Sequence, residues 1–156
     1  MILQPETLSQ DVLAFMRKTS IMSAAINGAP PISTVLLFTV DDDFTMYFAT
    51  LEGSYKVRGL QKDGQMSIAI WEHHELYLQG SGVASIVADP NKVTKIVDRL
   101  ADSAVNIADF WPPVLQIKGH DYVVFELKLS WLRARDLSDT TIVEKTTKFM
   151  EVPLDE

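Results

Sequence analysis

The chain has 156 residues, 47% of them hydrophobic and 22% charged, and its 14 basic and 21 acidic residues give a net charge of −7. These values predict one globular domain over residues 1–156. Because the sequence has no cysteine, disulfides, thiolate nucleophiles and cysteine-bound metals are excluded, and a reducing compartment, the cytoplasm, is expected. Because the chain is negatively charged and has no Lys/Arg cluster, no nucleic-acid partner and no contact with an anionic membrane are expected. No apolar stretch is long enough to predict a membrane-spanning segment.

The first predicted element is a helix that begins near Thr7. Thr7 and Gln10 have the spacing of a capping box, and apolar residues follow at helical intervals. These apolar residues are Leu8, Val12, Phe15 and Met16. A strand is predicted at Ile21–Ile26, which runs into the hairpin signal Asn27-Gly28. The returning strand, at 32–40, is almost continuously apolar, as in a closed barrel.

Strands 45–49, 65–71 and 76–87 are predicted after the acidic turn Asp41-Asp42-Asp43. A short helix from Ser54 to about Gln61 is predicted between the first two of them. A longer helix is predicted to begin at Asp89-Pro90, because Asp is a good N-cap and Pro fits the first helical turn.

The clearest predicted strand follows the segment Trp111-Pro112-Pro113, which breaks the helical pattern. Apolar and polar residues alternate along it, which is typical of a half-buried strand. Its predicted inner face consists of Val123, Phe125, Leu127, Leu129 and Trp131. The final stretch, 139–156, fits either an edge strand or an arm onto a partner. About six strands and three helices, without strict alternation, predict a mainly antiparallel β-barrel with flanking helices.

The segment 50–56 carries the most informative chemistry. It leaves a predicted strand at Thr50 and enters a predicted helix at Ser54, and a helix N-terminus offers free N–H groups and partial positive charge to an anion. Lys56 and Arg58 fall in the first turn, where positive charge is unfavourable unless an anion is bound nearby. On local chemistry alone, an ordinary capped helix with basic surface residues explains the pattern as well.

The same residues carry a family resemblance. Tyr47-Phe48-Ala49-Thr50, with Ser54 and Lys56, resembles the Thr-x-x-x-Ser-x-Lys segment of the pyridoxamine 5′-phosphate oxidase-like family, whose members are FMN-binding split β-barrels. The order of predicted elements is also similar, and Gly82-Val83-Ala84 resembles the family's Gly-x-Ala point. The resemblance covers about residues 5–136. It implies a split β-barrel of the FMN-binding type.

FMN is the cofactor that this resemblance implies, with its phosphate at the helix start and its ring along the strand 33–38. The cofactor-binding residues that it implies are Ser33, Thr34, Val35, Thr50, Ser54, Tyr55 and Lys56. The chain departs from the oxidase at the ends of that strand, where Ser33 and Phe38 replace basic residues. The oxidase's C-terminal Arg-x-His signature has no counterpart, which argues against pyridoxamine phosphate as the substrate.

The function that the resemblance implies is that of an FMN-dependent oxidoreductase, a homodimer with cofactor sites at its interface, acting on a small-molecule substrate or electron donor. No side chain stands out as a catalytic acid, base or nucleophile, which fits a protein whose cofactor performs the redox chemistry. Two alternatives stay open. One is a non-enzymatic FMN or haem carrier or sensor, and the other is a dimeric interaction module that has lost its cofactor.

Other motifs have simpler explanations. Adjacent histidines in Glu72-His73-His74-Glu75 would point to opposite faces of a strand, so a solvated turn is expected and no metal site. His120 is expected in a turn. Gly80 and Gly82 predict either a barrel bend or bulge, or the close approach of a ligand or partner backbone. Trp111 and Trp131 are expected to be core or interface aromatics.

Overall fold

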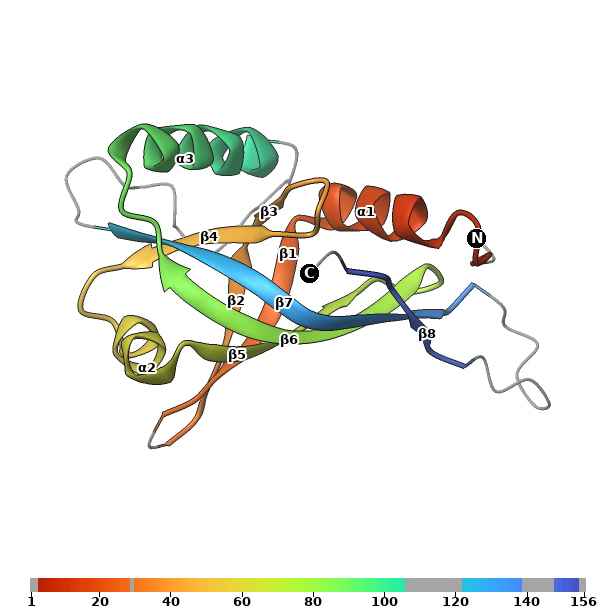
Figure 1. Cartoon of the computed structure of the whole chain (residues 1–156), viewed down its shortest axis with the longest axis horizontal. Helices are drawn as coiled ribbons and strands as arrows, with labels where there is room; N and C mark the ends of the chain where they lie inside the picture. Colours follow the sequence, from red (N-terminus) through yellow and green to blue (C-terminus); the bar gives the residue numbers. More distant parts are fainter. Residues whose placement is uncertain (1–2, 29, 106–121, 139–147, 155–156) are drawn as a thin grey trace.

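A strongly curled antiparallel sheet dominates the chain (Figure 1). The computed structural model describes residues 3–28, 30–105, 122–138 and 148–154, and within them it contains eight strands and three helices. The elements are α1 (Leu8–Thr19), β1 (Ile21–Ile26), β2 (Ile32–Leu37), β3 (Thr39–Val40), β4 (Met46–Leu51), α2 (Tyr55–Asp63), β5 (Gln65–Trp71), β6 (Leu76–Ile86), α3 (Pro90–Val105), β7 (Tyr122–Asp136) and β8 (Met150–Glu151). The predicted fold class, a split β-barrel with flanking helices, is confirmed.

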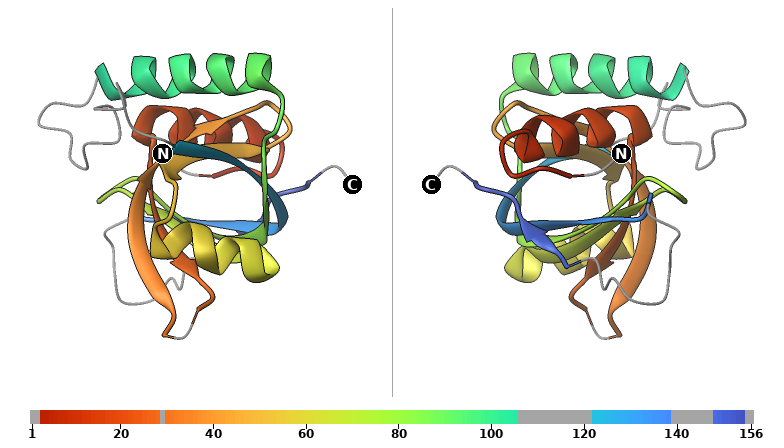
Figure 2. Two further views of the ribbon diagram at one scale, coloured as in Figure 1. Left: turned by 90° about the vertical axis from the view of Figure 1, so that its left-hand side faces the viewer. Right: turned by 90° about the vertical axis from the view of Figure 1, so that its right-hand side faces the viewer.

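The sheet follows the strand order β2-β1-β5-β6-β7-β4-β3, and β8 pairs with β7. The predicted single strand 32–40 is wrong at one point, because it breaks at Phe38 into β2 and β3. There the backbone N–H of Phe38 donates to the carbonyl oxygen of Ser20 at 2.9 Å. The break carries the chain from one end of the strand order to the other. Consequently the sheet curls back toward itself, and no ladder joins β2 to β4 within the described residues (Figure 2).

Two hydrophobic clusters hold this arrangement together. The larger one fills the inside of the curled sheet and includes the stacked rings of Phe48 and Phe125, whose centroids are 5.4 Å apart. The smaller one lies between the outer side of the sheet and α3, where Ile96 and Leu100 pack against Tyr47 and the neighbouring strands. Helices α1 and α3 lie on one side of the molecule and α2 lies on the opposite side (Figures 1 and 2).

Helix α1 begins where it was predicted, but its predicted capping box is wrong. Thr7 is the N-cap residue, yet its side chain accepts no hydrogen bond from the helix backbone. Instead its hydroxyl donates to a carboxylate oxygen of Asp11 at 2.9 Å. An ionised acceptor one turn ahead forms a stronger hydrogen bond than a neutral partner, so the Thr7 side chain turns away from the N–H groups. The predicted apolar face of this helix is buried.

Strand β7 contains a β-bulge that the alternating pattern did not predict. Ser81 pairs with Trp131, but Gly82 pairs with Leu129, so Ser130 is an extra residue. The inner face therefore changes from odd to even positions, and Leu132 is fully buried while Trp131 is 39% exposed. The prediction that Trp131 shares a face with Leu129 is wrong for this reason.

Gly82 explains why the bulge is possible. A Cβ atom at this position would lie 2.2 Å from the carbonyl oxygen of Lys128, a contact that no side chain could accommodate. The predicted bulge is thus found at Gly82, where the approaching backbone belongs to β7 of the same chain, whereas Gly80 pairs regularly with Leu132.

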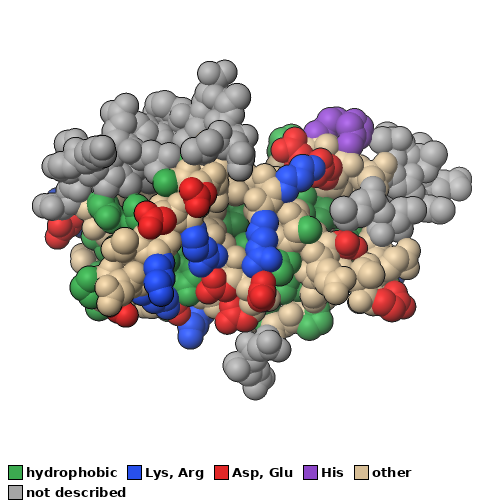
Figure 3. All heavy atoms as spheres, turned by 90° about the horizontal axis from the view of Figure 1, so that it is seen from above, with side chains coloured by type: hydrophobic (Ala, Val, Ile, Leu, Met, Phe, Trp, Pro, Cys, Tyr) green, Lys and Arg blue, Asp and Glu red, His purple; other side chains and the backbone are tan. Residues whose placement is uncertain are grey.

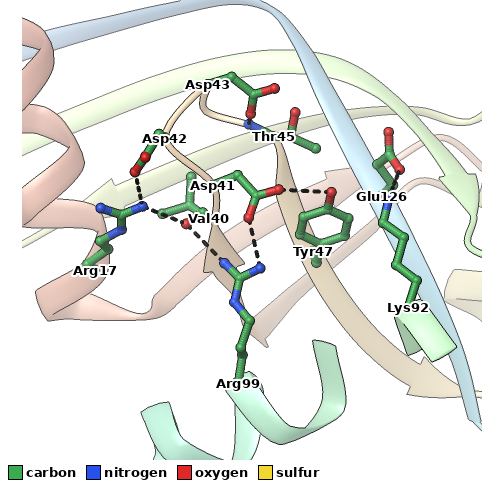
Figure 4. Close-up of polar contacts among 10 residues, drawn as sticks. All are labelled: Arg17, Val40, Asp41, Asp42, Asp43, Thr45, Tyr47, Lys92, Arg99 and Glu126. Carbon is green, nitrogen blue, oxygen red and sulfur yellow. Dashed lines mark hydrogen bonds and ion pairs between the residues drawn. The ribbon is translucent and has the colours of Figure 1, made fainter. Parts of the chain in front are cut away.

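Ion pairs join the helices to the turn after β3 (Figure 4). Arg17 of α1 and Arg99 of α3 both donate to the carbonyl oxygen of Val40, at 3.3 and 3.1 Å. They also pair with Asp42 and Asp41, at 2.7 and 2.8 Å. Basic and acidic side chains are interspersed on this side of the molecule (Figure 3). No helix in the described part of the chain is long and apolar enough to cross a membrane.

Candidate functional site

The site begins at the connection between β4 and α2. Gly53 has φ = 77°, a left-handed conformation that turns the chain sharply and that glycine adopts without strain. Ser54 follows in an extended conformation as the N-cap, and its hydroxyl oxygen accepts a hydrogen bond from the N–H of Val57 at 3.4 Å. The predicted short helix is confirmed, with its first helical residue at Tyr55 and its last at Asp63.

Helix α2 is held against the β1–β2 hairpin by a close backbone contact. A Cβ atom at Gly59 would lie 2.5 Å from the carbonyl oxygen of Asn27 and 2.9 Å from a methyl group of Ile26. Asn27 also donates from its side-chain amide to Asp63 at 3.2 Å. These contacts hold the middle and the last residue of α2 against the β1–β2 hairpin.

A pocket of about 480 Å³ lies between the start of α2 and the start of β2. It opens near the end of β4, at the side of the sheet where β2 and β4 are not paired. The residues that line it are Ile32, Ser33, Thr34, Gly53, Ser54, Tyr55, Lys56 and Arg58. The structure thus brings together two segments that the sequence analysis assigned to one cofactor site.

Two of the predicted site residues do not line this pocket. Thr50 lies four residues before Ser54, near the end of β4, and is only 5% exposed. Val35 lies on the exposed side of β2, and 45% of its surface is accessible. Its cross-strand neighbour is Ser23 of β1, so Val35 belongs to the outer face of the sheet beside the pocket.

The charge around the pocket is positive. Lys56 and Arg58 both line it, and no lining residue is a carboxylate. Neither of these cations forms a salt bridge with any residue that the structure describes. Helix α2 also has no acidic residue in its first turn, so the partial positive charge of its N-terminus adds to that of the two side chains. In a chain of net charge −7, this pocket is suited to an anion.

Three of the lining residues, Ile32, Gly53 and Arg58, are absent from the set of cofactor-binding residues that the resemblance implied. Arg58 lies three positions after Tyr55, a spacing that places both side chains on one face of a helix. The guanidinium carbon of Arg58 lies 5.7 Å from the centre of the Tyr55 ring. The position of Arg58 in the first turn of the predicted helix, together with Lys56, was its signal in the sequence.

A second polar cluster lies beneath α3, on the side of the molecule opposite α2 (Figures 1 and 4). The hydroxyl of Tyr47 donates to Asp41 at 3.1 Å, and Lys92 pairs with Glu126 at 3.1 Å. Burial, and then the hydrogen bond to Asp41, raise the pKa of Tyr47. The hydrogen bond to Glu126 raises the pKa of Lys92. The Lys92–Glu126 pair joins α3 to β7.

The remaining candidate residues contribute nothing to the pocket. His73 and His74 lie in the turn between β5 and β6, as predicted, with ring centroids 3.8 Å apart. The described residues contain no cluster of three or more side chains able to hold a metal ion. Trp111 and His120 lie outside the described residues, as does most of the predicted final stretch, of which Met150–Glu151 forms β8.

Comparison with known proteins agrees with this fold. The general stress protein 26 of Bacillus anthracis is 16% identical and has a TM-score of 0.64, with 94% of this chain and 99% of that one covered. A Clostridium acetobutylicum protein described as related to general stress protein 26, of the pyridoxinephosphate oxidase family, is 13% identical with a TM-score of 0.65 and 96% coverage of both chains. ChuZ of Campylobacter jejuni has a TM-score of 0.70 at 14% identity, covering 86% of this chain and 58% of that one.

The sequence itself matches a family model. None of the curated proteins matches the chain, but residues 8–136 match the model described as pyridoxamine 5′-phosphate oxidase. The match includes the pocket, the split between β2 and β4, and the whole of β7. The chain belongs to the pyridoxamine 5′-phosphate oxidase family.

Proposed function

We propose that this protein binds FMN in the pocket between α2 and β2. The observation that carries the proposal is the convergence of Ser33, Thr34, Ser54 and Lys56 on one positively charged pocket. The phosphate of FMN would be bound by the N-terminus of α2 with Ser54 and Lys56, because free helix N–H groups, a hydroxyl and a cation are the usual partners of a phosphate. The flavin ring would lie along the start of β2.

Bound FMN would supply hydride and electron transfer, and the protein would bind and orient the cofactor. Thr50, buried near the end of β4, would support the phosphate end without lining the pocket. Ser33, Thr34 and Val35 offer the ring a strand edge, because β2 is the terminal strand of the order and has no partner on its outer side within the described sheet. An edge strand of this kind has free backbone donors and acceptors for the polar atoms of a flavin.

Flavin titration tests this proposal directly. FMN should lose fluorescence when the protein is added, with saturation at micromolar concentrations, and riboflavin should bind more weakly because it has no phosphate. If no binding is seen at tens of micromolar FMN, the proposal is wrong, and the result would favour a protein that acts as a dimeric interaction module. A Soret band in the purified protein would favour haem.

The cofactor site is proposed to lie at the interface of a homodimer. Small side chains continue from β2 across β1, β5 and β6 on the outer face of the sheet. They form two cross-strand rows, with Ser33, Ala25, Ser67 and Ser81 in one row and Ser23 and Ala69 in the other. Val35 and Trp131 border this surface and are 45% and 39% exposed. A surface of small residues with aromatic and aliphatic borders suits close packing against a second copy.

We further propose that the flavoprotein is an oxidoreductase acting on a small molecule. Family membership supports this class, and stopped-flow mixing with NADH or NADPH tests it. Bleaching of the flavin absorbance within seconds is the expected result. Reduction by dithionite alone would favour a carrier or sensor.

A further inference from the structure

We propose that Arg58, positioned by the ring of Tyr55, is a second cationic contact of the cofactor's phosphate. This inference rests on the proposed FMN site and adds to it a residue that the family resemblance did not supply. Arg58 lines the same pocket as Ser54 and Lys56.

The side chain of Arg58 is available for an anion. It forms no salt bridge with the described residues, whereas Asp41, Asp42 and Glu126 on the opposite side of the molecule are paired with cations (Figure 4). Its backbone N–H already donates to the carbonyl oxygen of Ser54 at 3.2 Å, so the residue is fixed to the helix start. A guanidinium offers five N–H donors in a planar arrangement that matches phosphate oxygens.

Tyr55 explains how a long, exposed side chain can be held ready. The guanidinium of Arg58 lies over the Tyr55 ring, 5.7 Å from its centre, which is within the range of cation–π attraction. The ring is 75% exposed, so its burial in the core does not explain its position. We infer that Tyr55 restricts the rotamers of Arg58 and thereby lowers the entropic cost of binding the phosphate.

The positions of Lys56 and Arg58 also affect the stability of the protein without a bound anion. Two cations in the first turn of a helix, with no acid beside them, oppose the helix dipole. A phosphate between Lys56 and Arg58 removes that cost. The arrangement is therefore unfavourable without an anion and favourable with one.

The decisive measurement is the ratio of FMN to riboflavin affinity. Arg58→Gln should weaken FMN binding about three- to twentyfold, the range between an exposed and a well-formed charged hydrogen bond. Riboflavin affinity should not change. Lys62→Gln is the matched control, because it removes the same charge from the last turn of the same helix, away from the lining of the pocket.

Two variants of Tyr55 test whether its ring positions Arg58. Introduced into the wild-type protein, Tyr55→Leu should reduce the ratio of FMN affinity to riboflavin affinity. Introduced into Arg58→Gln, it should have no further effect on that ratio. Tyr55→Phe keeps the ring face and should behave as wild type. Circular dichroism confirms that each variant is folded.

The outcomes separate this inference from the proposed function. If the wild-type protein does not bind FMN, the proposed function is wrong. If it binds FMN in preference to riboflavin and Arg58→Gln leaves the ratio unchanged, only the role of Arg58 is refuted. If Arg58→Gln lowers the ratio but Tyr55→Leu does not, Arg58 contacts the phosphate without help from Tyr55, and the positioning role is refuted.

Discussion

Gly59 of α2 lies directly against the carbonyl oxygen of Asn27, so close that a Cβ atom on Gly59 would stand 2.5 Å from that oxygen. In an exposed helix, Gly→Ala stabilises by about 1 kcal/mol. Here the added methyl group would push α2 away from the hairpin, at a cost of roughly 1–3 kcal/mol. We therefore expect Gly59→Ala to lower the free energy of unfolding and to weaken FMN binding, as measured by thermal melting and flavin titration.

Whether Gly59→Ala lowers or raises the free energy of unfolding distinguishes the packing of α2 against the hairpin from helix propensity. Gln61 is exposed on the same helix, and Gln61→Ala should leave both stability and FMN affinity within a few tenths of a kcal/mol of wild type. If Gly59→Ala raised the melting temperature, the hairpin would not position the helix as described.

Lys56 is expected to contribute to the binding of phosphate and not to folding. Lys56→Met should weaken FMN binding by roughly 1.5–3 kcal/mol, the range for charge-assisted hydrogen bonds, and should leave riboflavin binding unchanged. The melting temperature should not fall, because a cation in the first turn does not stabilise the helix dipole. Equal losses for FMN and riboflavin would mean that Lys56 affects the pocket in general, and no loss would place it on the surface.

Asp43 should make stability depend on acid pH. The backbone N–H of Thr45 donates to its carboxylate at 3.0 Å, and this hydrogen bond lowers the pKa of Asp43 below 3.8. A lowered pKa in the folded state contributes stability above pH 3.8 that is lost as the pH falls through the folded value. The melting-temperature difference between wild type and Asp43→Ala should thus be largest near neutral pH and shrink in acid. A difference that stays constant would mean that the carboxylate charge has no part in it.

The outer face of the sheet predicts a homodimer. Light scattering should give twice the 17.5 kDa of one chain. Ser67 lies in the middle of the small-residue surface, with its hydroxyl 2.8 Å from that of Ser81. Ser67→Arg should produce monomers, because a long charged side chain prevents close approach, whereas Gln61→Arg on α2 should stay dimeric. A wild-type mass of one chain would refute the dimer.

Much of the fold could be predicted because local residue types determine where many of its elements begin and end. β1 and β5 occupy the predicted residues, since each ends at a turn whose chemistry is visible in the sequence. The break at Phe38 could not be predicted in this way. Its cause is a hydrogen bond to Ser20, eighteen residues earlier, which exists only once the sheet has curled. Alternation likewise gives no sign of an extra residue at Ser130, because the bulge depends on what lies opposite in β6.

In the candidate site, too, the local features could be predicted from the sequence and the long-range contacts could not. The turn at Gly53 and the cap at Ser54 follow from local residue types, so the helix start was predictable. The second wall of the pocket, formed by Ser33 and Thr34, came from the family resemblance, because no local pattern reveals which strand lies beside a helix. Arg58 was visible as a first-turn cation beside Lys56, but its contact with the Tyr55 ring was not predicted, because cation–π pairs leave no strong sequence pattern.

The extra residue in β7 has a consequence for how the length of this strand can vary. Inserting one residue between Trp131 and Leu132 would turn Arg133 toward the interior positions that Leu132 and Ala134 now occupy, each 0% exposed. A guanidinium there would be unsolvated, at a cost of several kcal/mol. Deleting Ser130 itself would instead remove the bulge and leave Leu129, Leu132 and Ala134 facing inward, because Ser130 is the extra residue. The strand is in effect two half-strands of opposite phase, and Ser130, at their junction, can be lost without reversing the faces of either half.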